Sequence, residues 1–522
     1  HNCFVPRTWR IHSFRSSRNM NMQDQEQDPI SFADVEKQQP PGYDTPIQPA
    51  ELEEINPNVI EWDGEDDPEN PRNWPARKKW TNAGLLSAMT LVTPLASFMF
   101  APDVELVLRE FHSTNSVLAA LVLSIYVFGY CFGPLIAAPL SELYGRVPVY
   151  HVSNFLFVIL TIACALSNSL NMLIVFRFLA GAGGSTAVTI GGGSFGDLFK
   201  AEERGAAISL WTMGPIVGPV IGPVCGGFLA QAMGWRWVFW LLSILGGVLT
   251  VAMLVFLQET YPVVVLERKA ARLRKSTGNP NLKSSLALEI SPSELFKRTI
   301  FRPIKMFISP IVLLLSIYMA FVYGILYVLL TTLTQVFIQT YGFSRGIAGL
   351  SYLGLGMGMV IGLVVFSQTS DRGMQRLAAK NDGVVKPEYR FPPMIPAGFL
   401  IPGGLFIYGW TAEYAVHWIV PIVGMGLVGL GIMGVNMPIS AYLIDAFTIH
   451  SASALAANTI LRSLFGAFLP LAGPVLYGRL GLGWGNSLLA FVAVAMIPIP
   501  VLFWRFGEGL RMRVGMRMRM RG

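Results

Sequence analysis

The sequence predicts an all-α integral membrane protein with twelve transmembrane helices in two six-helix bundles and both termini in the cytoplasm. The first reason is composition: of 522 residues, 52% are hydrophobic and 14% are charged, against about 25% charged in ordinary soluble domains. The second is that twelve apolar segments are each long enough to cross a bilayer. The third is that one long charged segment divides them into two sets of six. This composition excludes a disordered chain, a coiled coil and a simple soluble enzyme.

The twelve expected spans follow one another along most of the chain. Each needs about 20 mostly apolar residues. They are expected at residues 81–102, 115–138, 149–167, 170–193, 206–230, 237–257, 306–330, 346–368, 392–411, 415–444, 452–478 and 484–504. Residues 331–343 are more polar, so the seventh span is expected to end before them.

The segments outside the spans are charged. Residues 19–71 hold 15 acidic residues and one base, Lys37, and have few aliphatic side chains to bury, which predicts a disordered acidic tail. Because the sequence begins with His1, Met20 and Met22 are candidate start residues. The predicted division is a cytoplasmic tail at 1–79, an N-terminal bundle at 80–257, a cytoplasmic central loop at 258–305, a C-terminal bundle at 306–504 and a basic tail at 505–522.

Positive charge decides the expected orientation. With the N-terminus inside, the inner segments after residue 71 hold 28 Lys and Arg and the outer loops hold four, and Lys and Arg favour the cytoplasmic side of a membrane. The arginines from Arg511 to Arg521 either contact anionic headgroups of the lipid bilayer or form a solvated tail. A tail this short on a membrane protein does not indicate a nucleic-acid partner.

The loop between the second and third spans places a carboxylate and an arginine around a glycine, as Glu142, Gly145 and Arg146. Such a pair can lock the cytoplasmic ends of the two bundles, because an ion pair at a wet boundary contributes only about 1 kcal/mol and is readily broken. The alternative is an ordinary topological anchor. The loop resembles the signature between the second and third helices of the major facilitator superfamily, with Ala138 and Val147 in place of the usual glycine and second base.

Arg177 opens the fourth span and is followed by Gly181 and Gly184. A charge inside an apolar helix is costly unless it faces a partner or a cavity, so Arg177 is a functional candidate. Snorkelling toward the nearby outer face is the alternative. The RxxxGxxG spacing resembles the fourth-helix motif of the superfamily, whose arginine is associated with proton coupling.

The fifth span carries a series of Gly-Pro pairs. Its glycines recur every four residues and therefore lie on one helix face, where small residues allow another helix to pack closely, while the prolines loosen the helix. The series comprises Gly214, Pro215, Gly218, Pro219, Gly222, Pro223, Gly226 and Gly227. Its end resembles the signature of antiporters, meaning exporters, within the superfamily, with Ser209 where that signature has an earlier glycine.

Further stretches resemble the fungal twelve-helix drug:proton antiporter branch of the superfamily. They lie at 70–80, 192–199, 234–239 and 445–463. In the second half, Ser370 to Arg372 form a degenerate copy of the acidic-basic loop that holds Glu142 and Arg146. The resemblance covers about residues 65–507. It implies proton-coupled efflux of small hydrophobic organic compounds, such as drugs, toxins or fungal secondary metabolites, by alternating access. It also implies a monomer in the cell membrane, with the vacuolar membrane as the alternative.

The resemblance implies a substrate cavity between the two halves, near the membrane midplane. The candidates for lining it are polar or aromatic side chains inside spans, several of them paired at i, i+4 on one helix face. They are Tyr126, Tyr130, Tyr323, Tyr327, Asn436, Asn458 and Arg462. For each tyrosine the alternative is an interfacial belt or a packed helix contact.

The proton gradient is the expected energy source, without a cofactor, because the sequence has no Gly-Lys-Ser/Thr phosphate loop. The six histidines and four cysteines have no metal or catalytic spacing, so neither a metal site nor an enzyme is expected. Few carboxylates lie deep in spans, since Asp103 and Glu105 fall in an outer loop and Asp445 at a span edge. The alternatives are a proton symporter that imports a small nutrient and, least favoured, a membrane sensor without transport.

Overall fold

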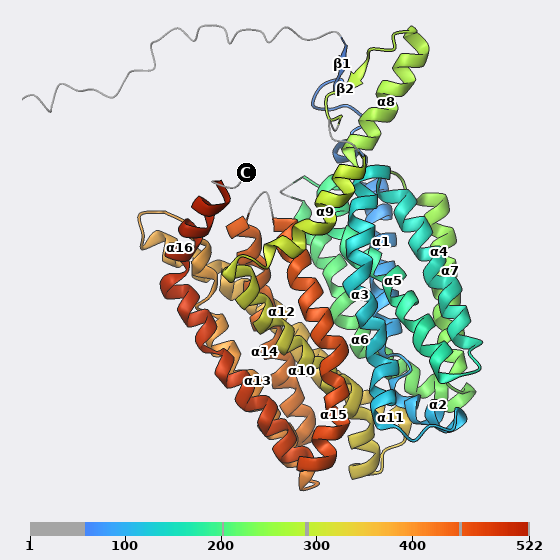
Figure 1. Cartoon of the computed structure of the whole chain (residues 1–522), viewed down its shortest axis with the longest axis vertical. Helices are drawn as coiled ribbons and strands as arrows, with labels where there is room; N and C mark the ends of the chain where they lie inside the picture. The colour runs from blue at the N-terminus through green and yellow to red at the C-terminus, as the bar shows by residue number, and fades with distance from the viewer. Residues whose placement is uncertain (1–57, 201–202, 288–291, 448–450, 520–522) are drawn as a thin grey trace, which may run out of the picture. The chain divides into compact units, whose positions relative to one another are not determined.

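Long helices make up almost all of the chain that the structure describes (Figure 1). The computed structural model describes residues 58–200, 203–287, 292–447 and 451–519. Bundle 1 consists of α1 (Ala76–Phe98), α3 (Ser116–Tyr144), α4 (Arg146–Ala165), α5 (Leu170–Leu198), α6 (Arg204–Met233) and α7 (Arg236–Phe256). Bundle 2 consists of α10 (Pro310–Tyr341), α12 (Tyr352–Ala379), α13 (Met394–Glu413), α14 (Ile419–Phe447), α15 (Ser451–Met496) and α16 (Pro498–Arg519). A short helix, η2 (Pro71–Asn73), precedes α1, and the connections hold η3 (Ala101–Asp103), α2 (Val104–Glu110), α8 (Pro262–Thr277), α9 (Pro292–Met306), α11 (Arg345–Leu350) and η4 (Pro387–Arg390).

The twelve expected spans are all helical. Eleven segments of the described chain are long and apolar enough to cross a membrane. The last of these runs over 62 residues, Ser451–Met512, about three times the ~20 residues that one crossing needs. At Gly481, where φ is 73°, the helix is interrupted, and the chain turns back (Figure 1). Its two arms match the predicted spans at 452–478 and 484–504, which brings the number of spans to twelve.

The predicted end of the seventh span is wrong. The polarity of residues 331–343 predicts an end near residue 330, but α10 continues to Tyr341. Threonine hydroxyl groups there donate to carbonyl oxygens one turn back, Thr331 to Tyr327 at 2.9 Å and Thr332 to Val328 at 2.7 Å. Because this local bond satisfies the hydroxyl, polar residues of this kind do not end a helix in apolar surroundings.

The helices pair in the same order within each bundle. In bundle 1, α1 packs against α6, α3 against α5, and α4 against α5 and α7; in bundle 2, α10 packs against α15, α12 against α14, and α13 against α14 and α15. Between the bundles, α3 packs against α15 and α6 against α12. Each of these two contacts joins the second helix of one half to the fifth helix of the other. The fold is therefore an internal duplication, the arrangement found in many transporter folds.

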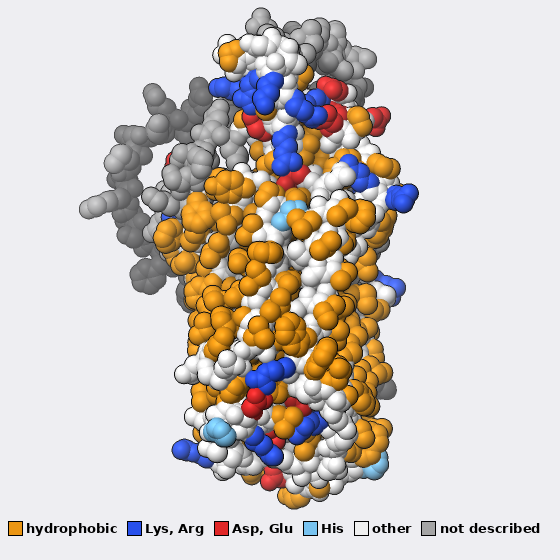
Figure 2. Space-filling view, turned by 90° about the vertical axis from the view of Figure 1, so that its right-hand side faces the viewer, with side chains coloured by type: hydrophobic (Ala, Val, Ile, Leu, Met, Phe, Trp, Pro, Cys, Tyr) orange, Lys and Arg blue, Asp and Glu red, His pale blue; other side chains and the backbone are white. Residues whose placement is uncertain are grey.

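The bundles have two unlike ends. One end, called here the basic face, carries the α3–α4 turn, the central segment with α8 and α9, and the last turns of α16 (Figure 1). The other end, the opposite face, carries α2, α11 and the bend at which α15 turns back. Figure 2 shows a belt of hydrophobic side chains between the two ends, with many Lys and Arg gathered near the central segment. That belt is the surface expected to meet the hydrocarbon core of a bilayer.

The acidic segment before α1 is ordered from residue 58 onward, which corrects the prediction of a disordered tail that reaches residue 79. β1 (Val59–Ile60) pairs in parallel with β2 (Lys283–Ser284), and Lys269 on α8 pairs with Asp63 and Asp67, each at 2.8 Å. Composition alone fails here because the bases that neutralise these acids come from the central segment, far along the chain.

These contacts favour the charged form of Asp67. Burial raises the pKa of this carboxyl group, but hydrogen bonds from Lys269 and from the backbone N–H groups of Asp63 and Glu69 outweigh burial and lower the pKa below its usual value of 3.8. The ion pair with Lys269 is therefore present at neutral pH. Residues 1–57, the rest of the predicted tail, lie outside the described residues.

Candidate functional site

The turn between α3 and α4 is built around a carboxylate that follows α7. Glu259 accepts hydrogen bonds from the backbone N–H groups of Arg146 at 2.9 Å and Val147 at 3.2 Å. Gly145 has a φ of +99°, and a Cβ at this position would collide with the Glu259 carboxylate. Glycine is therefore needed both for the backbone conformation and for the space.

The Arg146 side chain joins α3, α4 and α5 within bundle 1. Its Nε lies 3.3 Å from the Asp197 carboxylate at the end of α5, and a terminal nitrogen donates to Ser141 Oγ at 2.7 Å. The guanidinium group also stacks over the Tyr261 ring, 4.5 Å from its centroid. The acidic partner of Arg146 is thus Asp197, which lies 51 residues away in the sequence. The only sequence signal for this acid is its position directly after Gly196, near the end of an apolar span.

Glu142 faces α9 rather than forming a simple pair with Arg146. Its carboxylate lies close to Thr299 and within electrostatic reach of Arg146 and Arg302. Because α9 packs against both α3 and α15, this helix bridges the two bundles at the basic face. The predicted gating residues therefore take part in two neighbouring junctions, one inside bundle 1 and one toward bundle 2.

Arg177 is fully enclosed in bundle 1. It is 1% exposed, and its guanidinium group donates to the carbonyl oxygens of Ala96 (3.4 Å), Ser97 (2.8 Å), Val122 (2.7 Å) and Leu123 (3.3 Å). Three aromatic rings surround the cation. No ion pair of Arg177 with a carboxylate occurs within the described part of the chain. The snorkelling alternative is wrong, because Arg177 ties α1 and α3 together from α5.

The Gly-Pro series of α6 packs on the backbone of α1. A Cβ on Gly214 would lie 2.7 Å from the Thr90 carbonyl oxygen, and one on Gly226 would overlap the Met99 carbonyl oxygen. The two glycines between them approach α1 in the same way. All three prolines of the series that precede Gly226 remain inside one continuous helix. The glycine face therefore forms a backbone-to-backbone seam within bundle 1.

The end of the same series touches bundle 2 at the opposite face. A Cβ on Gly227 would lie 2.7 Å from the Arg345 carbonyl oxygen, and one on Gly349 would lie 2.5 Å from the Pro223 carbonyl oxygen. Side chains larger than glycine would push α6 and α11 apart. The two bundles are thus closed against each other at the opposite face.

One ion pair joins the two bundles at this closed face. Asp103, in η3, is fully buried and lies 3.6 Å from Nε of Arg345 in α11. Neither of its carboxylate oxygens has a hydrogen-bond partner among the described residues. Among the described residues, no other ion pair connects bundle 1 with bundle 2. Sequence patterns do not reveal this pair, because the two residues lie in loops of different halves.

Four of the predicted substrate residues meet at the interface between the bundles, whereas Tyr126 is buried inside bundle 1, where its hydroxyl group donates to the Thr93 carbonyl oxygen at 2.8 Å and its ring lies beside Arg177. Tyr126 and Tyr130 of α3 have ring centroids 5.7 Å apart, as do Tyr323 and Tyr327 of α10. The Arg462 guanidinium group of α15 lies 4.7 Å from the Tyr323 ring centroid. Tyr130 lies within electrostatic reach of Tyr323 and Tyr327. We call Tyr130, Tyr323, Tyr327 and Arg462 the central cluster.

The two predicted asparagines differ in their placement. Asn458 lies one turn before Arg462 on α15, is 2% exposed, and has no hydrogen-bond partner for Oδ1. Asn436 is on α14, where its side-chain oxygen accepts a hydrogen bond from Ser440 at 3.2 Å. Asn458 thus extends the central cluster by one helical turn, whereas the structure does not place Asn436 there.

Bundle 2 has its own charged junction at the basic face. Arg390 pairs with both Asp371 and Asp445 at 2.8 Å, and Glu388 pairs with Arg511 at 3.0 Å. The degenerate loop copy at residues 370–372 therefore still supplies an ion-pair partner, Asp371. Asp445, which the sequence places at the edge of a span, also forms an ion pair with Arg390. No three His, Cys, Asp or Glu side chains come together as a metal site in the described chain.

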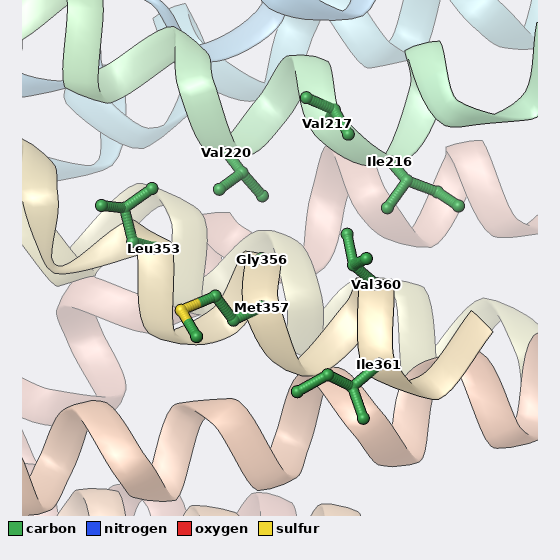
Figure 3. Close-up of a pocket in the computed structure, with 8 residues that line it drawn as sticks. All are labelled: Ile216, Val217, Val220, Leu353, Gly356, Met357, Val360 and Ile361. Carbon is green, nitrogen blue, oxygen red and sulfur yellow. The ribbon is translucent and has the colours of Figure 1, made fainter. Parts of the chain in front are cut away.

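A cavity of about 340 Å³ lies between α6 and α12 (Figure 3). Its lining residues are Ile216, Val217, Val220, Leu353, Gly356, Met357, Val360 and Ile361. All of these are apolar, and Met357 is 64% exposed. The cavity includes no residue of the central cluster. A lining without polar groups cannot orient a ligand, so the central cluster is the better candidate for recognition.

The fold and these junctions define a class of membrane transporter. Residues 86–470 match the Major Facilitator Superfamily. The chain belongs to this family and is a transporter, not an enzyme. Its fold is similar to that of the xylose transporter XylE from E. coli, solved in a partially occluded inward open conformation, with a TM-score of 0.62 over 83% of this chain and 98% of that one. The two sequences are 16% identical, so this likeness concerns the fold alone.

Two fungal relatives are much closer in sequence. "Efflux pump radE" of Floropilus chiversii is 54% identical over 461 residues, which cover 88% of this chain and 86% of that protein. "MFS-type transporter penM" of Penicillium rubens is 53% identical over 478 residues, which cover 90% of this chain and 94% of that protein.

Proposed function

We propose that this transporter exports small hydrophobic organic compounds, such as drugs, toxins or fungal secondary metabolites, by proton-coupled alternating access. The observation that carries the proposal is the 54% identity, over 88% of the chain, to a protein named an efflux pump. The duplicated bundles supply two halves that can rock about a site between them. The α6 seam against α1 and α11 supports export, because it lies in the stretch that resembles the antiporter signature.

The proposed orientation places the basic face in the cytoplasm of a cell-membrane protein that works as a monomer. The excess of Lys and Arg in the segments at this face supports it. The opposite face, where α6 touches α11 and Asp103 pairs with Arg345, is then extracellular. In this orientation the structure is closed toward the outside.

The central cluster is the proposed substrate site. It draws residues from both bundles, and aromatic rings suit varied hydrophobic ligands because any aromatic or apolar surface can pack on them. Glu142, Gly145 and Arg146 are the proposed gating residues at the cytoplasmic end. Arg177 takes part in proton coupling by fixing the last turns of α1, which lead directly to the buried carboxylate of Asp103.

Growth of a pump-deficient yeast strain that expresses the chain tests the proposal. The plates carry hydrophobic toxins, polyamines and fungal metabolites, and cells with Arg177→Ala run beside the wild type, with resistance expressed per transporter molecule at the cell surface. Arg479→Ala is the matched control, since Arg479 is exposed on the opposite face. Resistance that is lost with Arg177→Ala and kept with Arg479→Ala supports coupled export. Sensitisation by the wild type would instead indicate import.

A further inference from the structure

Arg462 is a half-buried cation that pairs with no carboxylate among the described residues. It is the twelfth residue of α15, about 17 Å from the start of that helix, and therefore near the middle of a hydrocarbon core of about 30 Å. Its Nε is buried and has no hydrogen-bond partner in the part of the chain that the structure describes. Within the described chain, its guanidinium group contacts the face of the Tyr323 ring but forms no ion pair.

The carboxylates of bundle 2 are engaged elsewhere. The sequence places no Asp or Glu in the middle of a span of this half. Five of its six carboxylates are held at the two faces by bases or by backbone N–H groups, as Asp371 and Asp445 with Arg390, Glu388 with Arg511, Glu508 with Lys386, and Glu413 with the Leu482 N–H. The sixth, Asp382, follows α12 in a loop. A cation left in apolar surroundings without a counterion is costly, so a negatively charged ligand oxygen would relieve that cost.

A second unpartnered group lies beside this cation. Asn458 is one helical turn from Arg462, which places their Cβ atoms about 5–6 Å apart. Its Oδ1 is an acceptor without a donor although the residue is 2% exposed. Buried polar atoms nearly always have a partner, so this oxygen is a second position at which a ligand can bind.

We propose that Arg462, Asn458 and the tyrosines of the central cluster form a subsite for aromatic acids, including acidic phenols. The guanidinium group binds the carboxylate or phenolate oxygen in a charge-assisted hydrogen bond. Asn458 Oδ1 accepts a hydrogen bond from a hydroxyl group of the same molecule, and the tyrosine rings pack on its aromatic part. This inference names the substrate class for the proposed export function and rests on that function for the direction of movement.

Equilibrium binding to the purified full-length protein tests the role of Arg462. The probes are 6-hydroxy-2-naphthoate and its neutral carboxamide, which differ in charge but hardly in shape. The wild type is expected to bind the acid at least about tenfold more tightly, the size of one charge-assisted hydrogen bond. Arg462→Gln should remove this preference while leaving binding of the carboxamide, and Arg462→Lys should restore part of it. Equal binding of both probes by the wild type, or an unchanged preference in Arg462→Gln, would overturn the subsite.

Asn458→Leu provides an independent arm with a side chain of similar size. The wild type is expected to bind 6-hydroxy-2-naphthoate several-fold more tightly than 2-naphthoate, because only the first has a hydroxyl donor. Asn458→Leu should bind the two equally and keep the preference for acid over carboxamide. If the hydroxyl group makes no difference to the wild type, Asn458 has no place in the subsite.

Binding and export fail in distinguishable ways. Arg462-dependent acid binding without protection of yeast would contradict the export proposal and leave the subsite standing. Protection of yeast against neutral toxins, with no preference for acids in the binding assay, would contradict the subsite and leave export standing. Carboxamide binding by Arg462→Gln serves as the folding control for both conclusions.

Discussion

Each bundle carries one arginine deep inside a span, and the two are placed in opposite ways. Arg177 in bundle 1 is 1% exposed and donates to four carbonyl oxygens. Arg462 in bundle 2 is partly exposed, leaves Nε without a partner, and contacts a single aromatic ring. In the first case the chain supplies everything that the charge needs, whereas in the second it does not.

The difference separates a charge that the chain itself satisfies from a charge that, in the proposed subsite, a ligand satisfies. A buried cation that is fully hydrogen-bonded stabilises one arrangement of its neighbours, and its removal leaves several acceptors unsatisfied. In the proposed subsite, a cation with free donors at the interface between the two bundles gains its partners when a ligand binds. Both residues look alike in the sequence, since each is a lone arginine in an apolar helix.

Removing Arg177 should have the largest effect on stability. Arg177→Ala takes donors from four carbonyl oxygens in a sealed site, and hydrogen bonds to a charged group contribute about 1.5–3 kcal/mol each. We expect a loss of about 4 kcal/mol or more, seen as a much lower melting temperature in detergent and poor surface expression. The melting temperature of Arg177→Lys, which keeps the charge but not the planar fork of donors, should lie between those of the wild type and Arg177→Ala. A wild-type melting temperature for Arg177→Ala would show that the carbonyl contacts do not stabilise bundle 1.

The buried charge of Asp103 at the opposite face is less fully satisfied than that of Arg177 and more fully than that of Arg462. Among the described residues it has one ion-pair partner, Arg345, but no hydrogen bond. Asp103→Asn should weaken closure by about 1–2 kcal/mol, a coupling typical of contacting residues, reduced because Arg345 is partly exposed. Spin labels at Met233 of α6 and Leu480 of α15, both exposed, should report longer distances in the variant when the native cysteines are replaced.

The double variant Asp103→Asn with Arg345→Gln isolates this pair. If the pair acts as a unit, the two single variants and the double variant should all shift the distance distribution to a similar extent. Strictly additive shifts would mean that each residue acts through other contacts, and the ion pair would then not hold the opposite face closed.

The Gly145 turn offers a smaller effect with a closely matched control. Gly145→Ala combines a positive φ with a collision against Glu259, while Gly234→Ala has a similar φ of +88° and no atom within 4 Å of the new Cβ. Backbone strain alone should cost each variant about 1 kcal/mol, and Gly145→Ala should cost about 1 kcal/mol more. Thermal melting of both variants measures the difference, and equal losses would rule out the packing role of Glu259.

The sequence predicts the fold far better than it predicts the partners of charged residues. Apolar length and the Gly-Pro spacing depend on local chemistry, so the twelve spans and the small-residue face of α6 were accessible from residues alone. The ends of helices were harder to predict from the residues alone, because the hydroxyl groups of Thr331 and Thr332 donate to carbonyl oxygens of α10 itself and so do not end the helix.

Ion pairs between distant segments could not be predicted. Asp197 with Arg146, Asp103 with Arg345, and Lys269 with Asp67 join residues 51, 242 and 202 positions apart. Nothing in composition or periodicity selects one base for a given acid over such separations. The central cluster was accessible for the opposite reason, since a pair of tyrosines at i, i+4 and an arginine inside an apolar span are recognised from local spacing alone.

The smallest expected effect on stability belongs to Arg462. Arg462→Ala loses one cation–π contact, worth about 0.5–2 kcal/mol, and also removes an uncompensated charge from the membrane interior, which works in the opposite direction. We therefore expect a net change within about 1 kcal/mol and a melting temperature close to that of the wild type, although recognition of acids should be lost. A destabilisation as large as that of Arg177→Ala would mean that Arg462 also acts as a structural clamp, and the contrast between the two bundles would then disappear.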